Sequence, residues 1–140
     1  MSDLSDDGAT FSILLVADSG RLAALAAGLS ADGRVWLRQR PTLAQARETL
    51  TGRTVDALLV DADLSDGAGV DLVRLVSRSH PFVNQGLVSD LSAEEFHETF
   101  EGLGLFIQIP PDADAEFARE ILQRLARIQT LSGPAPTRRP

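Results

Sequence analysis

Two aspartates stand where apolar runs of the chain end. Asp18 directly follows the run 11–17 (FSILLVA), and Asp61 directly follows the run 57–60 (ALLV). If these runs are neighbouring strands of a parallel sheet, the two carboxylates converge at one edge of it. Paired carboxylates with a nearby main-chain carbonyl suit a hard cation such as Mg²⁺, and an aspartate beside that cation can attack a phosphoryl group. The residues therefore point to metal-assisted phosphoryl transfer onto an aspartate.

Other kinds of chemistry are excluded by composition. The 140 residues include no cysteine, which removes thiol nucleophiles, disulfides, iron-sulfur clusters and cysteine-ligated zinc. The histidines, His80 and His97, lie away from the predicted strand ends, so Ser19 and Ser65 have no base for hydrolysis. We expect no enzyme and no cofactor other than Mg²⁺. All 13 basic residues are arginine, and lysine is absent.

Charge and length limit the partners and the domain organisation. A net charge of -7 repels nucleic acid and anionic lipid, and no apolar run is long enough to span a membrane. We therefore expect a cytoplasmic protein that binds neither nucleic acid nor membrane. The composition predicts an acidic disordered tail over 1–10, one domain over 11–130 and a proline-rich disordered tail over 131–140.

Short apolar runs alternate with helical periodicity along the chain. The runs predict strands, and apolar residues spaced three or four apart predict helices. Asp18 and Ser19 offer capping chemistry for the first helix, Pro41 and Thr42 open the second, and Ser92 with Glu95 forms a capping box for the fourth. The predicted strands are 11–17, 35–39, 57–60, 82–89 and 105–109, and periodic apolar residues mark helices over 22–29, 43–50, 70–77, 96–100 and 117–128.

This alternation predicts an α/β fold of the flavodoxin-like (βα)5 type. Right-handed crossovers place helices on both faces of a five-stranded parallel sheet in the order 2-1-3-4-5. Ligands of such sheets bind at the carboxyl ends of the strands. The residues to inspect are therefore Asp18, Asp61, Ser89 and Ile109, which lie at those ends.

The segment 56–72 (DALLVDADLSDGAGVDL) resembles the receiver domain of bacterial response regulators, the CheY-like family. In that family a glycine falls eight residues after the phosphoacceptor, and Gly69 stands eight residues after Asp61. The resemblance continues through Ser89, Phe106 and Pro110, and it covers roughly residues 10 to 128 in the right order.

The resemblance implies a role for each matching residue. Asp61 would accept the phosphoryl group and Ser89 would contact it. Asp18, Asp61 and the main-chain carbonyl of Asp63 would bind Mg²⁺. Phe106 would be the switch aromatic of the fifth strand, although it lacks a hydroxyl.

Two departures from the family pattern weaken that chemistry. Ala17 replaces the first of two adjacent acidic residues, which lowers the charge available to bind Mg²⁺. Ile109 replaces the lysine before Pro110, and misalignment cannot explain this loss in a chain without lysine. A lysine bound to a phosphoryl oxygen contributes roughly 1.5–3 kcal/mol. Asp90, after Ser89, adds a negative charge beside an incoming dianion, and Ser65 replaces a customary proline.

Simpler interpretations remain open for several of these residues. Asp18 would serve equally well as a helix cap, and Ser89 as an ordinary hydroxyl at a strand end. Asp90 has the character of a turn residue, and Trp36 that of a packed or partly exposed strand residue. Solvated loop or helix-start positions are the simpler interpretation for the remaining aspartates, Asp63, Asp66 and Asp71.

Three functions remain. The first is an atypical stand-alone receiver, a pseudo-receiver, which has lost or weakened phosphorylation and binds signalling proteins in a two-component system or phosphorelay. Its partners would be a kinase, a regulator or a scaffold, bound through the face of the fourth helix, fifth strand and fifth helix, with homodimerisation as an option. The second is a response regulator that accepts phosphate on Asp61 from a histidine kinase. The third is a small-molecule sensor that uses the vacated acidic site.

Overall fold

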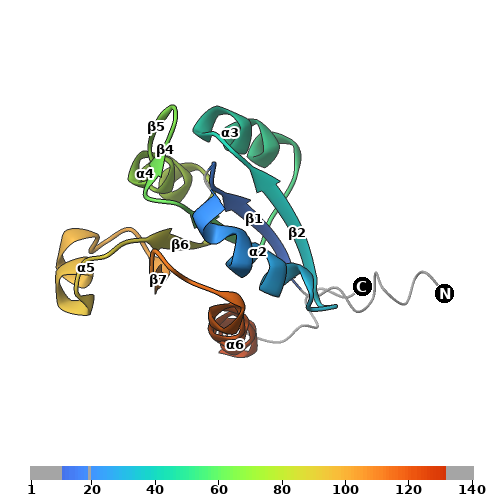
Figure 1. Ribbon diagram of the computed structural model, residues 1–140. Coiled ribbons are helices and arrows are strands. Elements are labelled where there is room, and N and C mark those ends of the chain that lie inside the picture. The colour runs from blue at the N-terminus through green and yellow to red at the C-terminus, as the bar shows by residue number, and fades with distance from the viewer. Residues whose placement is uncertain (1–10, 19, 132–140) are drawn as a thin grey trace.

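The computed structural model describes residues 11–18 and 20–131, and the predicted tails lie outside this part apart from the end of the last helix. Five parallel strands form one sheet in the order β2-β1-β3-β6-β7 (Figure 1). Because β6 and β7 are the fourth and fifth strands of this sheet along the chain, the predicted flavodoxin-like order is confirmed. The strands are β1 (Phe11–Val16), β2 (Val35–Arg40), β3 (Ala57–Val60), β6 (Asn84–Val88) and β7 (Leu105–Ile109).

Burial explains the strand sequences. The central β3 is buried at every position, which is the expected result for an apolar run covered on both faces. The edge strand β2 is only partly buried and leaves Trp36 55% exposed, in keeping with its mixed sequence VWLRQR. Side chains alternate along the strands, so that Leu14 and Leu58 face one hydrophobic cluster while Leu15 and Leu59 face the other.

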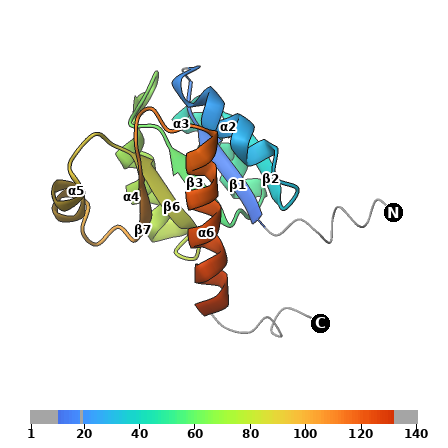
Figure 2. The same cartoon turned by 60° about the horizontal axis from the view of Figure 1, so that its bottom comes forward.

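The helices form a layer on each face of the sheet. Helices α3, α4 and α5 contribute buried residues to one cluster, and α2 and α6 contribute to the other. Figure 1 shows α3 and α4 above the sheet and α6 below it, and Figure 2 shows α6 lying across its face beside α2. The helical elements are η1 (Gly20–Leu22), α2 (Ala23–Ser30), α3 (Leu43–Gly52), α4 (Gly69–Ser79), α5 (Ala93–Thr99) and α6 (Ala115–Leu131).

Helices α2 and α6 approach each other closely at Gly28. A Cβ atom at this position would lie 2.6 Å from the Cα of Ala115. Glycine is therefore required on α2 for the N-terminal end of α6 to pack where it does. This contact joins α2 to α6, which cover the same face of the sheet.

Two of the predicted helix caps are confirmed. The Thr42 side chain accepts a hydrogen bond from the backbone N–H of Gln45, and Ser92 and Glu95 form a reciprocal capping box at α5. The capping role of Asp18 at the first α-helix is wrong, because α2 has Leu22 as its N-cap residue and no side-chain cap. The 3₁₀ turn η1 comes between Asp18 and α2 and carries the helix away from that carboxylate.

A small hairpin after β3 was not predicted from the sequence. The two-residue strands β4 (Asp63–Leu64) and β5 (Gly67–Ala68) pair antiparallel in the segment expected to be a loop. Ser65 and Asp66 form the turn, and Gly67, which follows it as the first residue of β5, has a φ of 152° that favours glycine. Within 11–18 and 20–131, no helix is long and apolar enough to cross a membrane.

Candidate functional site

Asp61 lies buried at the carboxyl end of β3, in the centre of the sheet. Its side chain is 2% exposed, and its backbone N–H donates to the carbonyl of Val16 at 2.9 Å. This bond extends the pairing of β3 with β1 by one residue beyond the ladder. A buried carboxylate requires hydrogen bonds or a counter-ion to remain ionised.

Arg21 is the cation that pairs with Asp61. Nη2 of Arg21, in η1, donates to Oδ1 of Asp61, and the backbone N–H of Ala62 donates to the same oxygen at 2.8 Å. The Arg21 side chain is 43% exposed, so the guanidinium covers the carboxylate from the solvent side. The ion pair therefore links the loop after β1 to the end of β3.

Asp18 holds the hairpin that follows β3. Its Oδ2 accepts a hydrogen bond of 2.7 Å from the backbone N–H of Ser65. The carboxylate is exposed, and it stands at the same edge of the sheet as Asp61 because β1 and β3 are neighbours. The prediction that the strand ends bring these two residues to one edge is confirmed.

Gly69 is packed against the backbone of Asp61. A Cβ atom at this position would lie 2.0 Å from the carbonyl oxygen of Asp61, which no side chain can tolerate. The N–H of Gly69 donates to the carbonyl of Ala62 at 2.8 Å. The spacing of eight residues between Asp61 and Gly69 thus has a steric cause, since α4 begins directly against the strand end.

Ser89 and Asp63 line a cleft beside the ion pair. The cleft has a volume of about 250 Å³, and Arg21 forms part of its wall. Oγ of Ser89 accepts from the backbone N–H of Leu91 at 3.1 Å, and its N–H donates to the carbonyl of Ile109 at 3.0 Å. The remaining lining residues are Ala62, Val70, Leu87, Val88, Asp90, Phe100 and Pro111.

Ala17 and Ile109 belong to the hydrophobic cluster beneath α2 and α6. Ile109 is fully buried there, and Ala17 packs against the same cluster. The position expected to hold a lysine is therefore filled by core packing, and Ile109 does not line the cleft.

Phe106 lies on β7 and does not line this cleft. It is half-buried, and its carbonyl accepts a hydrogen bond of 3.3 Å from Nη1 of Arg124 on α6. A groove of about 510 Å³ runs between α5 and β7 and includes Phe96, Phe100 and Phe106 in its lining.

The residues expected to bind Mg²⁺ are engaged with protein groups. Asp61 is paired with Arg21, and Asp18 accepts from the hairpin backbone. Among the residues that the structure describes, no group of three or more acidic, histidine or cysteine side chains is placed to hold a metal ion. With Arg21 in place, this arrangement does not fit Mg²⁺, and we derive no step that involves it.

Two residues that contribute to the structure around the site were not identified from the sequence. Arg21 follows Asp18 by only three positions, and the rule that loops after neighbouring strands share one edge could have directed attention to it. Asp66, interpreted as solvated, is exposed and also accepts hydrogen bonds from the backbone N–H of Leu43 at 2.9 Å and of Ala44 at 3.1 Å. These hydrogen bonds, the one from Leu43 above all, hold the pKa of Asp66 below its ordinary value. Asp66 is exposed at the turn of the hairpin, as the simpler interpretation has it, and these hydrogen bonds also join the hairpin to the start of α3.

The comparisons with known proteins agree with this geometry. The structure is similar to a CheY-like response regulator receiver domain from Methanospirillum hungatei JF-1, with a TM-score of 0.75, 17% identity, and coverage of 89% of this chain and 100% of that chain. The signal receiver domain of an HD domain-containing protein from Pseudomonas fluorescens Pf-5 gives a TM-score of 0.72 and 21% identity, with 88% of this chain and 92% of that chain covered. The chain has the fold of a response-regulator receiver domain.

A third receiver structure is also similar over a large part of the chain. The chemotaxis response regulator CheY4 of Vibrio cholerae gives a TM-score of 0.71 and 15% identity, with 83% of this chain and 98% of that chain covered. No protein-family model matches the sequence, and no curated protein has significant similarity to it. The receiver fold, predicted from the segment 56–72 and the strand order, is thus confirmed, and the roles of Asp61, Ser89, Asp18 and Asp63 in it stay predictions.

Proposed function

We propose that this chain is an atypical receiver that acts in cytoplasmic signal transduction by binding other proteins, with phosphorylation of Asp61 lost or weakened. The observation that carries the proposal is the ion pair between Arg21 and Asp61. A receiver carboxylate that is to attack a phosphoryl group needs beside it a bound cation that also contacts the phosphoryl group. The guanidinium of Arg21 instead neutralises Asp61 from within the protein.

Three further features support weak phosphorylation. Ala17 contributes no carboxylate, and Ile109 provides no cation to the phosphoryl group because it lies in the core. Asp63 and Asp90 line the cleft together with Ser89, so an incoming dianion meets carboxylates there. The negative charge at the cleft opposes the ligand that an active receiver must bind.

The interaction surface that we propose is formed by α5, β7 and α6. The groove between α5 and β7 exposes aromatic surface, and Phe106 lines this groove and a second hollow against α6. Apolar grooves with polar rims bind protein segments. A kinase, another regulator or a scaffold is the kind of partner proposed for it.

Phosphorylation by a histidine kinase remains the second candidate. Asp61, Asp18 and Ser89 are all present at the carboxyl edge of the sheet, as that activity requires. Arg21 would then have to leave Asp61, and its half-exposed side chain stands at the surface where such a movement is sterically open.

The intact mass of the protein after incubation with Mg²⁺ and acetyl phosphate tests the two candidates. We expect no phosphoryl adduct on the unmodified chain, while an active receiver domain treated in parallel gains one. The variant Arg21→Ala shows whether the ion pair is the barrier, and Asp61→Asn shows whether any adduct is on Asp61. An adduct on the unmodified chain that disappears in Asp61→Asn would contradict the proposal and establish the second candidate.

A further inference from the structure

Two helices on one face of the sheet carry like charges one turn apart. Arg74 and Arg78 are separated by four residues on α4, and Glu94 and Glu98 are separated by four on α5. All four side chains are exposed. Like charges at this spacing repel each other and destabilise the helix that carries them. A partner that supplies the opposite charge would remove this cost.

Helix geometry directs both pairs outward. Arg74 lies two positions from the buried Leu72 and Val76, which places it roughly 160° from them around the helix. Glu94 and Glu98 lie two positions on either side of Phe96, the buried residue of α5. Each pair therefore projects away from the core.

Within residues 11–18 and 20–131, neither pair is neutralised by an ion pair. In the part of the chain that the structure describes, Arg74, Arg78, Glu94 and Glu98 form no ion pair or hydrogen bond through their side chains. Asp71, the acidic residue in the first turn of α4, does not pair with either arginine. The charges are thus available to a partner.

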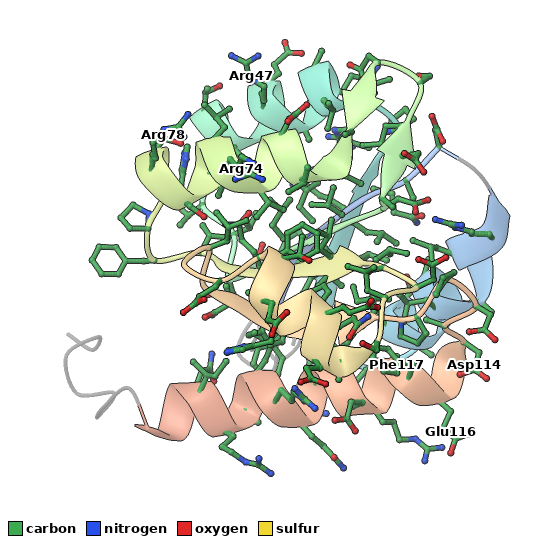
Figure 3. All side chains as sticks on the ribbon, turned by 90° about the vertical axis from the view of Figure 1, so that its left-hand side faces the viewer. Arg47, Arg74, Arg78, Asp114, Glu116 and Phe117 are labelled. Carbon is green, nitrogen blue, oxygen red and sulfur yellow. The ribbon has the colours of Figure 1, made fainter. Side chains whose placement is uncertain are left out.

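The two pairs lie on the same side of the molecule. Helices α4 and α5 both pack on the cluster that covers one face of the sheet, and both lie at the left in Figure 1. Figure 3 views that side and shows Arg74 and Arg78 on α4, Arg47 on α3 nearby, and α5 below α4. A single face is therefore positive along α4 and negative along α5.

We propose that this α4–α5 face, defined by Arg74, Arg78, Glu94 and Glu98, binds a second copy of the chain around a two-fold axis. In such an arrangement α4 of each copy faces α5 of the other. Each arginine pair then meets one glutamate pair, and this contact occurs twice in the dimer. A partner with a single sign of charge would neutralise the charges on one helix and repel those on the other. The second copy presents both signs in the matching order.

This inference deepens the proposed function and rests on it, because it names one partner of the interaction module. It does not depend on whether Asp61 accepts a phosphoryl group. The α4–α5 face shares helix α5 with the groove between α5 and β7, but Glu94 and Glu98 do not line that groove, so reversing their charge tests the α4–α5 face.

Sedimentation velocity over a range of protein concentrations tests the dimer with two charge-reversed variants. One carries Arg74→Glu with Arg78→Glu, and the other carries Glu94→Arg with Glu98→Arg. We expect the unmodified chain to form dimers, and each variant alone to raise the dimer Kd by roughly tenfold or more, since two like-charged contacts replace two attractive ones. An equimolar mixture of the two variants should recover dimers, because both contacts of the mixed dimer are again of opposite charge.

A matched control separates the local contact from the change in net charge. Arg119→Glu with Arg127→Glu alters the charge by the same amount as the α4 variant but lies on α6, on the other face of the sheet. This control should dimerise as the unmodified chain does. Thermal unfolding of every variant confirms that each is folded.

Four outcomes would overturn the proposal. A monomer at all concentrations, with the intact-mass result unchanged, shows that the face has another partner or none. A dimer that ignores the reversals lies on another surface. Two variants that fail to combine, although both are folded, show that α4 does not meet α5, and polymers in place of dimers show a head-to-tail contact.

Discussion

A Cβ atom at Gly69 would lie 2.0 Å from the carbonyl oxygen of Asp61. The start of α4 is thus in direct contact with the strand end that carries the candidate phosphoacceptor. Replacing Gly69 by alanine must displace one of the two backbones. We expect Gly69→Ala to lower the free energy of unfolding by about 1–3 kcal/mol or more, measured by urea denaturation. The control is Gly52→Ala at the end of α3, where a Cβ meets nothing within 4 Å. Equal stability of Gly69→Ala and the unmodified protein would show that α4 is not held against Asp61.

Removing the guanidinium of Arg21 should expose the cost of burying Asp61. Because Asp61 is 2% exposed and Arg21 is half-exposed, we expect Arg21→Ala to lower the free energy of unfolding by about 1–3 kcal/mol. Mg²⁺ should restore part of this loss in the variant and add little to the unmodified protein, because the cation would then replace the guanidinium. Urea denaturation with and without Mg²⁺ measures both effects. The control is Arg34→Ala, whose partner Asp32 is more exposed, and which should not respond to Mg²⁺. If Arg21→Ala behaves as that control does, the ion pair does not keep Mg²⁺ from Asp61.

The contact of Asp66 with the start of α3 should make stability depend on pH. Its pKa is lowered in the folded protein from the ordinary 3.8, chiefly by the hydrogen bond from Leu43. Below that value the unfolded chain binds the proton more readily than the folded chain does, so this stabilisation is present at neutral pH and decreases as the pH falls. Asp66→Asn should therefore lower the Tm at about pH 7 and differ less from the unmodified protein at about pH 3. Asp112→Asn, an exposed loop variant, serves as the reference. A difference in Tm that stays constant with pH would disprove the role of the Asp66 charge.

Gln85 is a buried polar residue whose replacement should cost little. Its Nε2 donates to the Val73 carbonyl at 3.2 Å and to Oγ of Ser77 at 3.1 Å, whereas its Oε1 has no partner among the described residues. Gln85→Met removes two hydrogen bonds and one unsatisfied acceptor, so we expect the free energy of unfolding to change by less than about 1 kcal/mol. Gln85→Glu should be strongly destabilising, since it buries a charge without a donor. Thermal and urea denaturation compare the two variants. A loss from Gln85→Met as large as that from Gln85→Glu would mean that Oε1 is hydrogen-bonded in solution.

The strands could be predicted because local burial dictates them, and their order could be predicted from the alternation of strands and helices joined by right-handed crossovers. Runs such as 57–60 are apolar at every position, and a strand buried on both faces leaves no other pattern. The capping residues Thr42 and Ser92 were predictable for the same local reason, since each bonds a backbone group three residues away.

The candidate site was harder to predict because its contacts join distant segments. Arg21 and Asp61 are 40 residues apart, and Leu43 and Asp66 are 23 apart. An exposed arginine or aspartate has the same sequence signature whether it is solvated or paired. The partner of each depends on where a loop passes, and the hydrophobic pattern does not encode that path.

Helix α6 is the last element to join the fold, and it packs on α2 beside Gly28. During synthesis the sheet face under α2 therefore remains uncovered until residues 115–131 have left the ribosome. The apolar residues that α6 will cover, Ile107 and Ile109 among them, are exposed to solvent or to chaperones until then. The packing of this face of the sheet is consequently complete only after residues 115–131 have been synthesised.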